Sequence, residues 1–223
     1  ILTIAAGLVF SRYLLVSVAN HQGAEKVASK ARAREFYYVI LIGLISASAA
    51  IIEGVGIDWS ALFSIEKFDA SVATGGISIA VFAAAMATIR FVADKVVARY
   101  GRIFVIRTGA AIAGAGVAMA LVMPTVQLSW LGWAVAGVGI SAVVPQCMAF
   151  ASDIGSKQNQ GRNLAKVVGL TYAGVLGGPA VIGFIGNAVG LQSALILGIV
   201  LAAFVAGGSM AMQKGGQKYG ETI

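Results

Sequence analysis

Two acidic residues, Glu53 and Asp58, lie in and beside an apolar stretch and are the residues best placed to hold charge or carry a proton. Glu53 follows the apolar or small run 39–52. A carboxylate at membrane depth is costly and usually faces a bundle interior or a water-filled cavity. The alternative is a carboxylate that reaches the membrane surface, since only four residues separate Glu53 from Asp58.

The spacing of the two carboxylates decides whether they act together. On an unbroken helix they would point roughly 140° apart, at about 3.6 residues per turn. Gly54 and Gly56 could unwind that turn and bring the carboxylates together, as broken membrane helices do at ion and solute sites. We therefore predict that Glu53 and Asp58 form a proton-coupling or substrate site. We also expect Glu53 to face the protein interior, because the small residues 46–50 on its helix suit close helix contact.

A basic segment between two apolar stretches is the second candidate, a gating loop. Its members are Arg90, Asp94, Lys95, Gly101 and Arg102. Arg90 and Asp94 are four residues apart and can pair on one helix face; Arg90 reaching for lipid phosphates is the alternative. We expect Asp94 to lie close to the start of a helix over 165–187, whose free N–H groups favour a negative charge.

Further polar and small residues are weaker candidates. Gln146, Tyr172 and Asn187 could line a cavity, although single polar residues in membrane helices often only bridge to neighbouring helices. Small residues on one stripe let helix backbones approach closely, and Pro145 and Pro179 each remove a backbone hydrogen bond and tend to kink a helix. The predicted helix-packing residues are Gly174, Gly178, Pro179 and Gly183.

Neither enzyme chemistry nor nucleic-acid binding is favoured by the sequence. It shows no nucleophile with a base, no phosphate loop and no metal cluster, and Cys147 and His21 each stand alone. No catalytic residue, cofactor or metal ligand is therefore predicted. The net charge of +7 does not indicate nucleic acid, because the basic residues gather between apolar spans.

Composition indicates an integral membrane protein. Hydrophobic residues make up 59% and charged residues 11% of the chain, and the mean hydropathy is +0.89. Seven continuous apolar stretches are long enough for a spanning helix of about 20 residues, and they lack the alternation of a membrane β-barrel. The stretches are 1–19, 37–57, 72–93, 104–123, 129–150, 165–187 and 191–212.

The links between these stretches alternate in charge. Basic residues fill the links 20–36, 94–103 and 151–164 and the C-terminal tail, whereas only Lys67 falls in a link of the other set. Cytoplasmic loops carry the excess of Lys and Arg. We therefore predict that these basic links and the tail are cytoplasmic.

Several motifs together resemble a known family. Asp94-Lys95 followed by Gly101-Arg102 resembles the signature loop of major facilitator superfamily (MFS) transporters, although the gap is longer and Arg90 replaces a Gly. The stretches Glu53 to Ala61, Gly137 to Pro145 and Tyr172 to Gly183 resemble, in that order, the C-terminal half of these transporters, within the branch that includes rhizopine-type (MosC-like) transporters.

The resemblance implies an all-α six-helix half bundle, helices seven to twelve, over 37–212. Residues 1–19 would be the end of helix six of a missing N-terminal half, 20–36 the central cytoplasmic loop, and 213–223 a cytoplasmic tail. It further implies secondary transport of a small solute by alternating access in the bacterial inner membrane, with the lipid bilayer, protons and the N-terminal half as partners. A non-transporting membrane sensor or assembly protein with the same fold is the alternative.

Overall fold

Six long apolar helices make up the part of the chain that is described by the computed structural model, residues 31–155 and 158–219. Each is long and apolar enough to cross a membrane, and the part described contains no strand. The prediction of six membrane helices over 37–212 is confirmed. The predicted segment 1–19 and most of the 20–36 link lie outside the described residues. The six helices span Ala31–Phe68, Val72–Tyr100, Arg102–Val122, Val126–Asp153, Gln160–Val189 and Leu191–Gln213.

The first of these, hereafter the first helix, runs unbroken from Ala31 to Phe68 and contains a π-helical turn. Residues 31–54 are α-helical, η1 (Val55–Trp59) is the π turn, and α2 (Ser60–Phe68) completes the helix. It ends at Asp69, which has a left-handed backbone with φ 52°. The predicted end at residue 57 was therefore wrong, because no helix-breaking residue follows the polar Asp58 until residue 69.

A single glycine separates α3 (Val72–Tyr100) from α4 (Arg102–Val122). The Ser71 side chain caps α3 by accepting a hydrogen bond from the Thr74 N–H at 3.2 Å. Gly101 has φ 82°, a conformation that only glycine adopts readily, and it ends α3. The predicted loop 94–103 thus shrinks to Gly101, and Asp94 and Lys95 lie on α3, because no residue before Gly101 breaks the helix.

The fourth membrane helix is broken in its middle. α5 (Val126–Ile140) and α6 (Val143–Asp153) are separated by a turn at residues 141–142, just before Pro145. The distortion expected from Pro145 is therefore present. Pro179 lies inside α7 (Gln160–Val189), which continues past it, and α8 (Leu191–Tyr219) returns after a turn at Gly190.

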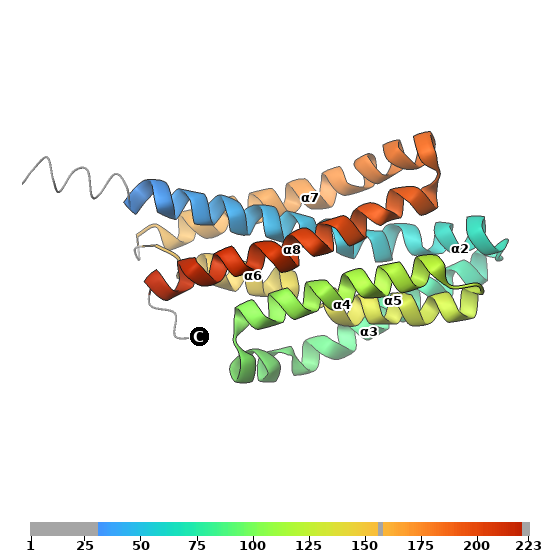
Figure 1. Ribbon diagram of the computed structural model, residues 1–223, viewed down its shortest axis with the longest axis horizontal. Coiled ribbons are helices and arrows are strands. Elements are labelled where there is room, and N and C mark those ends of the chain that lie inside the picture. The colour runs from blue at the N-terminus through green and yellow to red at the C-terminus, as the bar shows by residue number, and fades with distance from the viewer. Residues whose placement is uncertain (1–30, 156–157, 220–223) are drawn as a thin grey trace, which may run out of the picture. The chain divides into compact units, whose positions relative to one another are not determined.

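The helices pack as an antiparallel bundle in which α4 is central. α4 packs on α5 and α8, α3 packs on α5 and α2, and α7 packs on α8 and α6 (Figure 1). Glycines hold the α4–α5 seam so close that a Cβ on Gly116 would lie 2.2 Å from the Ala136 backbone nitrogen. Small residues at such contacts let van der Waals packing hold membrane helices together.

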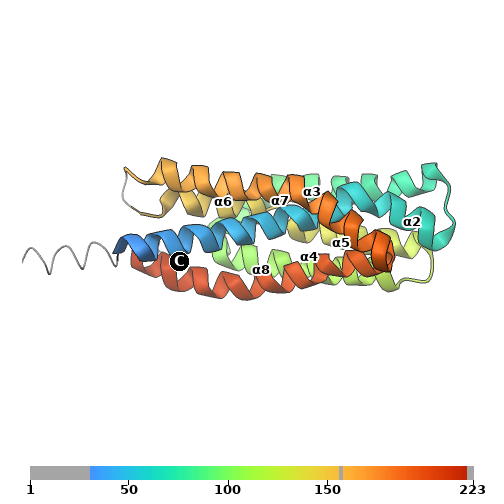
Figure 2. The ribbon, with the colours of Figure 1, turned by 90° about the horizontal axis from the view of Figure 1, so that it is seen from above.

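The turns gather at two opposite ends of the bundle. The α3–α4 turn, the end of α6, the start of α7 and the end of α8 lie at one end, and the turns at 69–71, 123–125 and 190 lie at the other (Figures 1 and 2). Lys67, at the second end, donates hydrogen bonds to the carbonyls of Leu121 and Met123 at the end of α4. A cation there complements the negative end of the α4 dipole.

Candidate functional site

A cavity of about 240 Å³ lies between the first helix and α7, and Val144 of α6 lies on its wall. The first helix contributes both predicted carboxylates to this wall, and most of the remaining lining is apolar. The lining residues are Ala50, Ile51, Glu53, Gly54, Ile57, Asp58, Trp59, Val144, Thr171, Gly174, Val175, Gly178, Pro179 and Ile182.

The π turn explains how Glu53 and Asp58 reach the same wall. In a π-helix the hydrogen bonds run from residue i to i+5, so residues five apart stack along one face. Glu53 lies two residues before η1, with Gly54 between them, and Asp58 lies within η1. The expected convergence thus occurs by a widened turn rather than by the unwinding at Gly54 and Gly56 that the sequence suggested.

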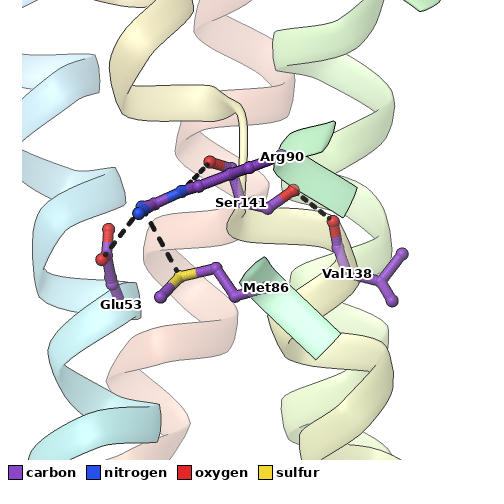
Figure 3. Close-up of polar contacts among 5 residues, drawn as sticks. All are labelled: Glu53, Met86, Arg90, Val138 and Ser141. Atoms are coloured by element: carbon purple, nitrogen blue, oxygen red, sulfur yellow. Dashed lines mark hydrogen bonds and ion pairs between the residues drawn. The ribbon is translucent and has the colours of Figure 1, made fainter. Parts of the chain in front are cut away.

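Arg90 of α3 joins Glu53 to the break in the fourth membrane helix. Its Nη2 lies 3.5 Å from Glu53 Oε1 and donates to Met86 Sδ at 3.8 Å, while its Nε donates to the Ser141 carbonyl oxygen at 3.3 Å (Figure 3). The Arg90 and Glu53 side chains are 49% and 28% exposed. The predicted pairing of Arg90 with Asp94 was therefore wrong. Among the described residues, Asp94 has no ion pair and Arg90 turns across to another helix.

The Ser141 carbonyl is available to Arg90 because of Pro145. Proline has no N–H, so it cannot donate to the carbonyl of the residue four positions earlier, which is Ser141. Ser141 is 1% exposed, and a buried carbonyl without a donor would be costly. Arg90 supplies that donor. The Ser141 hydroxyl donates to the Val138 carbonyl at 2.9 Å and so stays within α5 (Figure 3).

The seam between the first helix and α7 narrows on one side of the cavity. The Ser46 and Thr171 hydroxyls are 2.7 Å apart and buried, and a Cβ on Gly174 would lie 2.6 Å from the Ala47 carbonyl oxygen. Farther along, a Cβ on Gly178 would lie 3.2 Å from the Ile51 side chain, and one on Gly183 would lie 3.4 Å from the Trp59 ring. Gly178 and Pro179 also line the cavity.

The other predicted cavity residues do not lie on this wall. Gln146 is buried at 8% exposure, Tyr172 is 60% exposed, and Asn187 is exposed near the end of α7. Their assignment to a cavity stays a prediction, since only part of any larger cavity would be formed by these helices.

Within the described part of the chain, only Arg90 of the predicted gating residues reaches a residue of the cavity wall, Glu53. Arg102, which follows Gly101, pairs with Asp153 at the end of α6, whereas Lys95 is exposed on α3. Asp94 was expected beside the start of α7, but α3 and α7 are not a closely packed pair and run along opposite edges of the bundle in Figure 1. That expectation was wrong because it ignored the helices that separate α3 from α7.

The fold and the cavity together define a polytopic membrane protein with two carboxylates on the wall of a cavity between its helices. Comparison with known families then identifies the class of membrane protein. The model of the Major Facilitator Superfamily matches residues 39–212, and the chain belongs to this family. This is a family of transporters.

Three curated relatives resemble the chain. An uncharacterised MFS-type transporter of Yersinia pestis is 31% identical over 79% of this chain and 46% of its own length. Membrane protein MosC of Rhizobium meliloti is 29% identical over 75% of this chain and 41% of its own length. The uncharacterised transporter y4wD of Sinorhizobium fredii is 29% identical over 75% of this chain and 44% of its own length. The chain thus spans less than half the length of these relatives.

Sequence reasoning missed two polar contacts of the site, Arg90 with Glu53 and Ser46 with Thr171. Each joins residues far apart in the chain, and no local spacing reveals them. The sequence contained one signal for the Arg90 contact: Pro145 has no N–H, so the carbonyl of residue 141 lacks its helical donor and needs another. Arg90 is the donor that meets it.

Proposed function

We propose that this chain forms half of a secondary transporter that moves a small solute across the bacterial inner membrane by alternating access, coupled to protons. Family membership and the transporter names of two relatives support membrane transport. The proposal includes an N-terminal half as partner, with the solute held between the two halves. The end of the bundle that carries Gly101 and the end of α8 would face the cytoplasm, because the basic links gather there.

The observation that carries the coupling proposal is the contact of Glu53 with Arg90 beside the cavity. A hydrogen bond between two ionised groups is about twice as strong as a neutral one. Protonation of Glu53 would remove its charge and weaken the hold on Arg90. Arg90 also donates to Ser141 at the break between α5 and α6. A change in the protonation state of Glu53 would therefore alter the position of Arg90 and the angle between α5 and α6.

The test is proton-coupled transport by the full-length protein in liposomes with an internal pH dye, screened against small cationic, neutral and anionic solutes. Once a solute drives proton movement, Glu53→Gln should abolish accumulation driven by the proton gradient and leave exchange of solute across the membrane intact. Neutral Gln resembles the protonated carboxyl, so the exchange steps need no proton.

The matched control is Glu66→Gln, which removes an exposed carboxylate of α2 that does not line the cavity. It should accumulate solute like the parent. Full accumulation by Glu53→Gln would remove Glu53 from the mechanism and leave Asp58 as the coupling group. Proton movement with none of the solutes, in protein shown to be folded, would favour the non-transporting alternative.

A further inference from the structure

The cavity between the first helix and α7 has a charge imbalance that identifies the kind of ligand it would hold. Two residues on the cavity wall have charged side chains, Glu53 and Asp58, and both are acidic. None of the described residues that line the cavity is Lys or Arg. Glu53 is already engaged by Arg90. Asp58 forms no ion pair or side-chain hydrogen bond within the described part of the chain, so one negative charge on the wall is unmatched.

An unmatched carboxylate within a membrane-spanning helix is unfavourable unless a partner or water serves it. The first helix spans Ala31–Phe68, so Asp58 lies well before its end, and its side chain is exposed on the cavity wall rather than packed against other residues. A ligand with a single positive charge would supply the missing partner. An anion would meet the Asp58 carboxylate with no cation on the wall to offset the repulsion.

The remaining lining residues indicate that the uncharged part of the ligand is apolar. Ile51, Ile57, Val175 and Ile182 are apolar, and the Trp59 ring lies beside Asp58 in the chain. Aromatic faces attract cations within about 6 Å of the ring centroid. An apolar body with one charged group would therefore place its body on the aliphatic side chains and its charge between Asp58 and Trp59.

A second observation at the same wall is independent of charge. The indole N–H of Trp59 is buried and has no hydrogen-bond partner within the described residues. A buried donor without an acceptor is costly, and water that enters the cavity with a ligand can supply the acceptor. The cavity volume of about 240 Å³ lies below the range of about 300–1,000 Å³ that is typical of pockets for drug-sized ligands. A small molecule is the fitting occupant.

A metal ion fits this wall poorly. Only two carboxylates line it, and the described residues contain no group of three or more His, Cys, Asp or Glu side chains that could hold a metal. Calcium takes about six to eight oxygen ligands, far more than two side chains provide.

We propose that the cavity between the first helix and α7 binds a small monovalent organic cation, an ammonium group on a largely apolar body, with the Asp58 carboxylate as its counter-charge. This inference rests on the proposed transport function only where the bound ligand is identified with the transported solute. Binding itself can be tested without transport.

The experiment measures binding of three probes of similar shape to the full-length protein in detergent, by the shift of its melting temperature and by calorimetry. The probes are cyclohexylmethylamine, cyclohexylmethanol and cyclohexanecarboxylate. The amine should bind at least about tenfold more tightly than the other two, since hydrogen bonds to charged groups are stronger than neutral ones. This comparison uses the parent protein and does not depend on any variant folding.

The Asp58→Asn variant should lose about tenfold in amine affinity while its weak affinity for the alcohol stays unchanged. Glu66→Gln should bind all three probes like the parent. Equal binding of amine and alcohol by the parent, preference for the carboxylate, or unchanged amine affinity in folded Asp58→Asn would each overturn the inference.

The outcomes separate this inference from the transport proposal. Selective amine binding without solute-driven proton movement would keep the ligand class and reject transport. Proton movement driven only by neutral or anionic solutes would keep transport and reject the ligand class.

Discussion

Two glycine-rich seams of the bundle differ in what their glycines touch. In the α4–α5 seam, a Cβ on Gly116, Gly132 or Gly139 would come within 2.2–2.3 Å of a backbone nitrogen of the facing helix. In the seam of the first helix with α7, a Cβ on Gly174 would lie 2.6 Å from the Ala47 carbonyl oxygen and 2.9 Å from the Ala47 Cα, whereas a Cβ on Gly178 or Gly183 would meet only side chains, at 3.2 and 3.4 Å. Backbone atoms cannot yield without moving a helix, whereas side chains can rotate.

The surroundings of the two seams reinforce the difference. α4 packs on α8 as well as on α5, and α5 packs on α3 as well as on α4, so each seam helix is held from a second side. α7 has only 22% of its apolar window buried within the described bundle, against 56% for α4. The contrast suggests a rigid seam that fixes the bundle and a yielding seam that contains the cavity. Four substitutions test the difference between the two seams, in order of decreasing expected loss of stability.

Gly116→Ala should cause the largest loss of stability. Its Cβ would overlap the Ala136 nitrogen and the Gly132 carbonyl oxygen, at 2.2 and 2.8 Å, and overpacking costs about 1–3 kcal/mol or more. We expect about 3 kcal/mol, because both contacts are backbone. Reversible unfolding of the full-length protein in detergent measures it. The control is Gly76→Ala on α3, where nothing lies within 4 Å; a loss no greater than the control's would show that the α4–α5 seam yields.

Gly174→Ala should destabilise less, by about 1–2 kcal/mol. The added methyl would meet the Ala47 carbonyl oxygen at 2.6 Å, but α7 can move outward. The same unfolding measurement applies, and Gly169→Ala, also on α7 with nothing within 4 Å, is the control. A loss equal to that of Gly116→Ala would remove the distinction between the seams.

Ser46→Ala should cost about 0.6 kcal/mol, the average for hydrogen bonds between membrane helices. The loss is small because the Thr171 hydroxyl keeps its bond to the Val167 carbonyl at 2.8 Å. Thr171→Ser, which retains a hydroxyl, serves as the comparison in the same unfolding assay. A loss of several kcal/mol on Ser46→Ala would mean that this hydroxyl pair, rather than glycine packing, holds the seam.

Gly178→Ala should change stability least, because the added methyl meets only the Ile51 side chain, at 3.2 Å, and Ala favours a helix over Gly by about 1 kcal/mol. It should nevertheless weaken probe binding, since Gly178 lines the cavity. Gly177→Ala, with nothing within 4 Å, is the neighbouring control. Melting temperature and amine affinity together report the result, and unchanged affinity would place the ligand elsewhere.

The sequence predicted the number and type of membrane helices because continuous apolar runs leave few other structures in a bilayer. Helix ends were predicted less well. Asp94 and Lys95 suggested a loop by their charge, yet helical geometry tolerates charged residues, and α3 continues until Gly101. Asp58 misled in the same way at the first helix. Charge marks where a chain meets water, whereas α3, α7 and the first helix each stop at a residue with positive φ, namely Gly101, Gly190 and Asp69.

The site was predicted in part. Glu53 and Asp58 stood out as single carboxylates in apolar surroundings, and both lie on the cavity wall. Their roles in coupling or binding stay predictions. Arg90 was assigned to Asp94 because residues four apart on a helix are neighbours. Its contact with Glu53 depends on how α3 crosses the first helix, and a single sequence carries no record of that crossing.

The π turn in the first helix has a consequence for the alignment of its two halves. A helix advances about 100° per residue at about 3.6 residues per turn, so a turn that takes in one additional residue shifts every later side chain around the axis. Phe63 and Ser64, which are buried beyond the turn, owe their inward direction to that offset. Deleting a single residue from 55–59 would restore an ordinary helix and leave α2 on its packing face, because the deletion removes the additional residue that the wide turn takes in. The π turn therefore accommodates one additional residue while the buried residues before it and those after it, on α2, both keep their packing.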